Sequence, residues 1–163
     1  MCIPGQLAAH GYKNGLYVIP NGDAPAFVPA QADKPKNEKF EIIMTGRLAP
    51  EKNQQVLIKA AALSKHAGNI HLTLLGNGPK KKSLQKLAAK LGVDVTCNLL
   101  KKEDLMKKLQ SGDLYVHAAT VEIEAIAALE AIACGLVPVI ADSKASATPQ
   151  FALDERSLFK DND

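Results

Sequence analysis

Aromatic residues, cysteines and long apolar runs are all scarce in this chain. Phe, Trp and Tyr make up 4% of the 163 residues and Trp is absent, which leaves few rings to stack on bases and argues against nucleic acid as a partner. The three cysteines have no metal-ligand spacing and cannot all pair, so we expect reduced thiols in a cytoplasmic protein. With no apolar run of transmembrane length and no signal peptide, we expect at most a peripheral position at the inner face of the membrane.

The overall composition is that of an ordinary globular domain. Hydrophobic residues make up 47% and charged residues 23% of the chain, and 20 basic against 17 acidic residues give a net charge of +3. Lysine clusters at 80–82, 101–102 and 107–108 are typical of solubility, although they leave membrane-surface association open. Both ends of the sequence are abrupt, so we expect a piece of a longer protein.

Apolar strands alternate with amphipathic helices along most of the chain. A short strand at 16–19 is followed by a turn at Pro20-Asn21-Gly22, and residues 1–37 read as a leading segment and linker. Over residues 38–163 the patterns predict strands at 40–44, 71–75, 93–95, 113–117 and 136–140, and helices at 53–67, 79–91 and 103–110 and around Glu130. Strands that are apolar on both sides predict an α/β fold, a Rossmann-like doubly wound parallel sheet with helices on both faces.

Ligands of such sheets bind beyond the carboxyl ends of the strands. Arg47 and Lys52 follow the strand at 40–44, five positions apart across a turn that contains proline. Two cations there can hold a diphosphate without a metal ion. They can equally be two solvated surface cations, and the sequence leaves both interpretations open.

A second polar group follows the strand at 113–117. Glu122 lies on the loop and Glu130 on the next helix, where both carboxylates can point into one cleft beside the unpaired N–H groups of the helix start. The same acids can simply be favourable neighbours of a helix N-terminus or solvated helix positions. His117, at the end of the strand, can donate to a sugar or phosphate, or can serve as a satisfied structural group.

The glycines after the strand at 71–75 do not form a dinucleotide fingerprint. Gly76-Asn77-Gly78-Pro79 lacks the third glycine, because Lys81 stands at that position. No phosphate-binding loop motif is present either. We therefore expect Gly76 to allow a sharp turn beside a ligand.

Three motifs in order resemble one family over residues 16–159. Gly46-Arg-Leu-Ala-Pro-Glu-Lys52, Gly76-Asn-Gly-Pro79, and Glu122-x7-Glu130 followed by Ala131-Ile-Ala-Cys-Gly135 are similar to the retaining GT-B glycosyltransferases of family 4. The resemblance is to their C-terminal, donor-binding half. It implies that the acceptor domain and the closing C-terminal helices lie outside this chain.

The resemblance also implies a role for each matched residue. Arg47 and Lys52 would hold the donor diphosphate beside Gly46 and Gly76, and Glu122 would contact the transferred sugar, which makes Arg47, Lys52 and Glu122 the expected catalytic residues. Further expected contacts are Glu130 with the ribose, the amides of Ala125 and Ile126 with the phosphates, the loop at 97–100 with Asn98 and Leu99 against the base, and His117. The family usually has glycine where this chain has Ala125. A methyl group there can crowd the phosphate, or it is tolerated if φ is negative.

The expected function is therefore the donor-binding half of a retaining, metal-independent glycosyltransferase. It would transfer a hexose from a nucleotide sugar, by resemblance UDP-linked, to a lipid, glycan or cell-envelope acceptor, with the donor as substrate and neither cofactor nor metal. The isolated chain would bind nucleotide and transfer nothing. The alternative is a non-catalytic nucleotide-binding module of Rossmann or receiver type.

Overall fold

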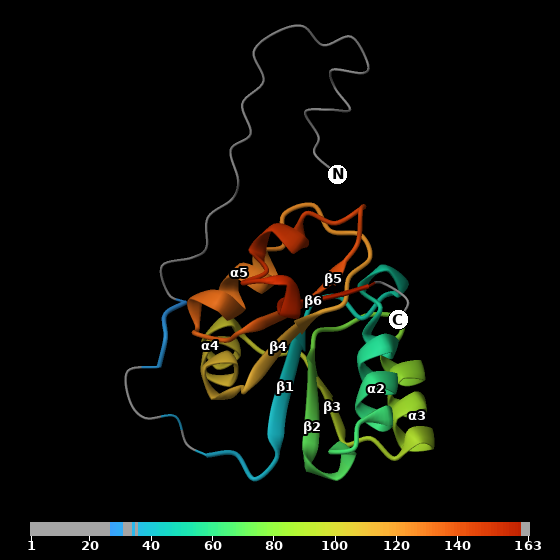
Figure 1. Ribbon diagram of the computed structural model, residues 1–163. Coiled ribbons are helices and arrows are strands. Elements are labelled where there is room, and N and C mark those ends of the chain that lie inside the picture. The colour runs from blue at the N-terminus through green and yellow to red at the C-terminus, as the bar shows by residue number, and fades with distance from the viewer. Residues whose placement is uncertain (1–26, 31–33, 35, 161–163) are drawn as a thin grey trace, which may run out of the picture.

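A computed structural model describes residues 27–30, 34 and 36–160 (Figure 1). These residues form one six-stranded sheet in the order β3-β2-β1-β4-β5-β6, in which all neighbouring strands are parallel. The strands are β1 Phe40–Thr45, β2 Ile70–Leu75, β3 Val95–Asn98, β4 Leu114–His117, β5 Pro138–Asp142 and β6 Leu158–Lys160. The predicted Rossmann-like parallel sheet is confirmed, and the strand order is that of a doubly wound dinucleotide-binding fold.

Helices cover both faces of the sheet (Figure 1). The α-helices are α2 Gln54–Leu63, α3 Lys81–Leu91, α4 Lys102–Ser111 and α5 Ile126–Ala133, and the 3-10 helices are η1 Pro50–Lys52, η2 Ala67–Asn69, η3 Thr148–Phe151 and η4 Glu155–Ser157. The α2–α3 pair lies side by side on one face, and α4 and α5 cover the other. Among the described residues no helix combines the length and the apolar character needed to cross a membrane.

Strand β1 shows why the strands read as apolar on both sides. Ile42 and Met44 point into the core under α2 and α3, whereas Ile43 between them points into the core under α4 and α5. All three are at most 8% exposed. Because successive side chains of a strand face opposite sides, a sheet covered twice needs apolar residues at every position.

Asp113 joins β1 to β4 at the edge where both strands begin. Its Oδ2 accepts the N–H of Glu41 at 2.8 Å, and its Oδ1 lies 2.5 Å from Nζ of Lys34. The Asp113 N–H donates in turn to the carbonyl of Glu41 at 2.8 Å. These bonds fix the register of the two central strands, and so the relative height of the loops at their far ends.

The strands predicted from residues 93 and 136 each begin two residues later than expected, for the same reason. Gly92 and Gly135 both have positive φ at a helix end, 67° and 89°. The next residue then donates back into the helix, Val93 to the carbonyl of Ala88 and Leu136 to that of Ala131, each at 3.0 Å. Val93 and Leu136 therefore belong to helix C-caps, and the strands start at residues 95 and 138.

The helix predicted at 53–67 also differs at both ends. Asn53 precedes the helix but makes no side-chain cap, because its backbone is left-handed at φ 51° and its N–H closes the preceding 3-10 turn onto Pro50. Beyond Ala61 no apolar side chain of this helix is buried, and Leu63 is 88% exposed, so the helix ends at residue 63.

Two further differences concern the start of α3 and the last strand. Some predictions for the start of the chain fall on residues that the structure does not describe. The helix predicted from residue 79 begins at 81, and β6 was not predicted because three residues are too few to show a period. The predicted strand at 16–19 and the turn at 20–22 lie outside the described residues.

Candidate functional site

The site lies where the chain leaves β1 and β4 in opposite directions. These strands are neighbours, with Ile42 opposite Leu114, but their following helices, α2 and α5, cover opposite faces. A crevice opens at such a switch point, outside the carboxyl ends of the strands. Arg47 and Lys52 follow β1, and Glu122 and Glu130 follow β4, so all four lie at this one edge of the sheet.

The loop after β1 is fixed by its neighbours. Gly46 donates from its N–H to the carbonyl of Leu75 at 2.9 Å, and Gln54 Nε2 donates to the carbonyl of Arg47 at 2.9 Å. The loop then enters the 3-10 helix η1, which ends at Lys52. These bonds leave the Arg47 side chain exposed while its backbone is held.

The loop after β4 is bound to this first loop. Thr120 donates from its N–H to the carbonyl of Glu51 at 3.0 Å, and its own carbonyl accepts from Ser143 Oγ at 2.7 Å. Two residues further on, Glu122 Oε2 lies 2.5 Å from Nζ of Lys52. The predicted cation and acid are thus brought into direct contact, each with less than a fifth of its side chain exposed.

Glu122 is ionised at neutral pH. The His117 ring and the Lys52 ammonium lower the pKa of Glu122 to about 2, against the opposite effect of partial burial. His117 Nε2 lies 3.5 Å from Glu122 Oε2 and makes no hydrogen bond of good geometry with any described residue. Because Lys52 is at 2.5 Å, we assign the larger part of the effect to Lys52. An anionic Glu122 can accept hydrogen bonds from hydroxyl groups and donates none.

A polar chain lies under this ion pair. His117 is 1% exposed, and its Nδ1 is 3.4 Å from the hydroxyl of Tyr115. That hydroxyl is 3.0 Å from Oγ1 of Thr45, and burial raises the pKa of Tyr115. His117 therefore lies beneath Glu122 without a hydrogen bond to it, and it is not among the residues that line the cavity described next.

A cavity of about 320 Å³ opens beside the pair, at the ends of β1 and β2. That volume suits a small ligand or part of a larger one. Its lining includes five residues expected at the site, Gly46, Arg47, Gly76, Leu99 and Glu130. It also includes Leu100 of the predicted loop at 97–100, and five residues that were not expected there: Thr45, Leu75, Asn77, Leu105 and Ala127.

The five expected residues that neither line the cavity nor lie beneath it are connected to residues that line it, either directly or through one partner. Lys52 passes over Gly46, since a methyl group on that glycine would lie 4.0 Å from the Lys52 Cδ, and Glu122 pairs with Lys52. Asn98 uses its carbonyl to accept the N–H of Gly76 at 2.7 Å. Ala125 and Ile126 begin α5, immediately before Ala127 of the lining.

A larger hollow of about 540 Å³ lies at the opposite edge of the sheet, next to Phe40 and Asp113. It is open and lies where the strands begin, whereas ligands of parallel sheets bind where they end. We therefore assign the candidate site to the smaller cavity.

The glycines after β2 let two loops touch. A methyl group on Gly76 would lie 1.9 Å from the carbonyl oxygen of Gly46, and one on Gly78 would lie 2.3 Å from that of Leu48. Gly76 also has φ 157°. The Gly-Asn-Gly sequence thus packs the loop after β2 on the loop after β1, which shapes the cavity wall.

Ala125 occupies a left-handed conformation at the start of α5. Its φ is 59°, so the condition of a negative φ, under which a methyl group was expected to be tolerated, is not met. The residue is 1% exposed, and its carbonyl accepts the N–H groups of Ala128 and Leu129. The methyl group is buried in the core under α5 and does not line the cavity, so the departure from glycine strains the backbone and leaves the cavity unobstructed.

Strand order and site together define the class, a Rossmann-like domain of the kind that forms one half of a GT-B enzyme. The receiver-type alternative is excluded by the strand order, since a receiver places β2-β1-β3 together. The sequence model of the family described as glycosyl transferases group 1 matches residues 8–162. The chain belongs to this family.

Similar proteins agree with this assignment. The crystal structure of the catalytic domain of cholesterol-alpha-glucosyltransferase from Helicobacter pylori is 56% identical, with a TM-score of 0.71 over 76% of this chain and 78% of that one. The C-terminal domain of LpcC, a glycosyl transferase group 1 family protein from Francisella tularensis, shares the fold with 24% identity and a TM-score of 0.70, over 87% of this chain and 81% of that one.

Among curated proteins, D-inositol 3-phosphate glycosyltransferase from Pseudarthrobacter chlorophenolicus is 32% identical over 136 residues, which is 75% of this chain. The match covers 32% of that relative. The chain therefore spans about a third of the length of the curated relatives that it matches.

Proposed function

We propose that the chain is the donor-binding half of a retaining, metal-independent glucosyltransferase that transfers glucose from UDP-glucose to the hydroxyl group of a membrane lipid, with a sterol as the first candidate. The observation that carries this proposal is that Arg47 and Glu130 line one cavity at the switch point and the Lys52–Glu122 ion pair lies beside it. The 56% identity to a cholesterol-alpha-glucosyltransferase supports glucose and a sterol acceptor.

The two cations would take the charge of the donor diphosphate. Arg47 lines the cavity with an exposed side chain, and Lys52 lies beside it. When the glycosidic bond to the diphosphate breaks, negative charge develops on the leaving UDP, and two fixed cations stabilise that charge. In other transferases a divalent metal ion stabilises this charge.

The two carboxylates would orient the rest of the donor. Glu130 lines the cavity and suits the hydroxyls of a ribose, and anionic Glu122 can accept from the hydroxyls of the transferred sugar. The reaction replaces the bond from glucose C1 to the diphosphate oxygen by a bond from C1 to the acceptor oxygen. The acceptor proton ends on the released diphosphate.

The remaining cavity wall suits the base. Leu99, Leu100 and Leu105 are among its apolar residues, and Leu99 is 70% exposed. A flat base can lie against such side chains while its edge meets the backbone of the loop after β3. The proposal of uracil as the base rests on the family resemblance.

Calorimetry of the chain with nucleotides tests the donor half of this proposal. We expect binding of UDP and UDP-glucose, weaker binding of GDP, and no response to NADH. EDTA should leave UDP binding unchanged. Binding of NADH without binding of UDP would overturn the assignment.

A test of the proposed acceptor requires a protein that also contains an acceptor-binding domain. Transfer of radiolabelled glucose from UDP-glucose should give a lipid product with cholesterol, and less with diacylglycerol or without acceptor. We expect no glucose transfer by the 163 residues alone. Transfer from GDP-mannose in preference to UDP-glucose would refute the proposed donor.

A further inference from the structure

One face of the domain carries basic charge that is not balanced by acids. Residues 53–92 contain no Asp or Glu, so all 17 acidic residues lie in the other parts of the chain. The same 40 residues contain seven lysines: Lys59, Lys65, Lys80, Lys81, Lys82, Lys86 and Lys90. They also contain no Phe, Tyr or Trp.

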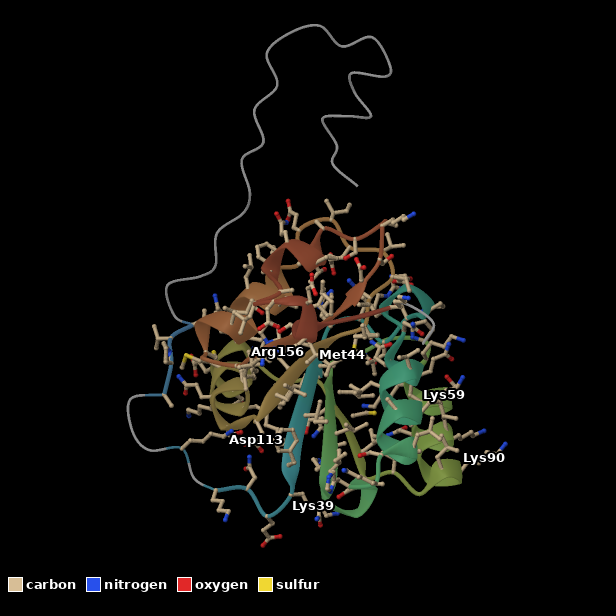
Figure 2. The ribbon with its side chains drawn as sticks, viewed as in Figure 1. Lys39, Met44, Lys59, Lys90, Asp113 and Arg156 are labelled. Atoms are coloured by element: carbon tan, nitrogen blue, oxygen red, sulfur yellow. The ribbon has the colours of Figure 1, made fainter. Side chains whose placement is uncertain are left out.

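The fold gathers this segment on one side. It contains α2, β2 and α3, and the two helices lie side by side over the same face of the sheet (Figure 1). Lys59 of α2 and Lys90 of α3 project from that side, away from the sheet (Figure 2). Six of the seven lysines are exposed, and Lys81 is partly buried. We call this surface the α2–α3 face.

These lysines are not used for ion pairs within the described chain. Other lysines there do pair, such as Lys39 with Asp94 at 2.6 Å and Lys108 with Glu41 at 3.1 Å. None of the seven lysines of the α2–α3 face has an acidic partner among the described residues. The face is therefore available to an external anion.

The arrangement also lowers the stability of the helix that bears most of it. Lys82, Lys86 and Lys90 follow one another at four-residue spacing, where like charges repel. The first turn of α3 contains lysines and no acid, although the N-terminal end of a helix favours negative charge. If the lysines served only solubility, glutamates would be expected among them on this helix.

Apolar side chains lie among the lysines. Leu63, four residues after Lys59 on α2, is 88% exposed, and Leu91, next to Lys90, is 39% exposed. Nucleic acid would be expected to meet aromatic residues as well, and this segment has none. Lysines with interspersed exposed leucines suit a surface that is anionic outside and apolar just beneath.

The face reaches the candidate site. Lys80 donates from its N–H to the carbonyl of Leu48 at 3.0 Å, and Gly76, four residues earlier, lines the cavity. A partner that covers the α2–α3 face would therefore lie beside the edge at which the donor is proposed to bind.

We propose that the α2–α3 face docks on an anionic lipid bilayer and holds the cavity near the membrane surface. The choice of a lipid partner rests on the proposed lipid acceptor. The charge complementarity between the lysines and an anionic surface does not depend on that proposal. Long-range attraction brings lysines to an anionic surface within about 10 Å at 0.1 M salt. Each lysine at such a surface strengthens binding roughly fivefold.

Co-sedimentation with vesicles tests the docking without any catalytic step. We expect the protein to sediment with phosphatidylcholine vesicles that contain about one third phosphatidylglycerol, and not with pure phosphatidylcholine, at about 0.1 M salt. At about 1 M salt, where screening acts within 3 Å, binding should be lost.

Two matched double variants locate the surface. Lys86→Gln with Lys90→Gln should weaken vesicle binding about 25-fold, because two lysines are removed. Lys101→Gln with Lys107→Gln makes the same change in net charge on the α4 side and should alter binding less than about threefold. Circular dichroism of both variants checks that they fold.

Equal losses in the two variants would overturn the proposal, because net charge alone would then explain the binding. Absence of binding to the anionic vesicles, or tighter binding of a fluorescent single-stranded oligonucleotide than of vesicles, would overturn it as well. Vesicle binding by a protein that transfers no glucose would separate this inference from the proposed function.

Discussion

Lys52 and Glu122 are 70 positions apart in the sequence, and their Nζ and Oε2 atoms lie 2.5 Å apart. The pair joins the loops after β1 and β4 at the switch point of the sheet. If Lys52 binds the donor diphosphate, the phosphate must compete with Glu122 for it. The same contact therefore holds the site in shape and limits its affinity.

Substitutions of the two partners should consequently have opposite effects on nucleotide binding. Glu122→Gln removes the competing carboxylate and should tighten UDP binding, whereas Lys52→Gln should weaken it, each by about tenfold, the range of a charge-assisted hydrogen bond. Calorimetric titration of UDP measures both. Weaker UDP binding in Glu122→Gln would contradict the competition.

The low pKa of Glu122 should make stability depend on pH. The pKa is about 2 in the folded protein against 4.5 for an unperturbed glutamate. As the pH falls below about 4.5, the unfolded chain binds this proton first, so stability present above that pH is lost progressively toward pH 2. The loss attributable to Glu122 is on the order of 1 to 3 kcal/mol, since the side chain retains some solvent contact.

Urea unfolding between about pH 6 and pH 3 measures this loss. The wild type should lose more free energy of unfolding over this range than Glu122→Gln, which has no carboxyl to titrate at that position. Asp94 and Asp113, whose pKa values are also lowered, affect both proteins alike. Parallel pH profiles would show that Glu122 is not stabilised in the folded state.

Gly76→Ala should be among the most damaging small substitutions. The added methyl group would lie 1.9 Å from the Gly46 carbonyl oxygen, and φ is 157°. We expect a loss of about 3 kcal/mol from overlap and backbone strain together. Gly68→Ala is the matched control, since no atom lies within 4 Å of its methyl position, and it should change stability by less than about 0.5 kcal/mol. Thermal unfolding of the two variants measures this difference in stability.

Ala125→Gly should be nearly neutral although it removes a buried methyl group. Relief of a left-handed alanine is worth about 1 to 2 kcal/mol, which offsets the lost methyl burial and the added freedom of glycine. Ala131→Gly removes an equally buried methyl group from the interior of the same helix, and should cost about 2 kcal/mol. Equal costs at the two positions would mean that Ala125 is not strained.

The parts of the fold that follow from periodicity could be predicted from the sequence. The strands at 40–44 and 71–75 are runs of apolar residues of the right length, and their observed bounds differ by one residue at most. Their parallel order follows from the alternation with helices. The starts of β3 and β5 could not be predicted as well, because Val93 and Leu136 are apolar in a helix cap just as they would be in a strand.

The candidate site was predictable as a set of residues at one edge but not in its contacts. Arg47, Lys52, Glu122 and Glu130 follow two predicted strands, and the carboxyl ends of parallel strands share one edge of a sheet. That Lys52 contacts Glu122 depends on the bond between Thr120 and Glu51, two residues with no local signal for it. The left-handed turn at Ala125 is likewise set by tertiary packing, because nothing in an alanine favours positive φ.

The contact of Gly76 with the Gly46 carbonyl leaves no space between two loops that line the cavity. A rearrangement of either loop must therefore carry the other with it. Libraries built to change donor preference should vary Arg47, Asn77 and Leu99, whose side chains are exposed, and keep Gly76 and Gly78 fixed. Diversity at the two glycines would yield mostly unfolded clones, whatever nucleotide was used for selection.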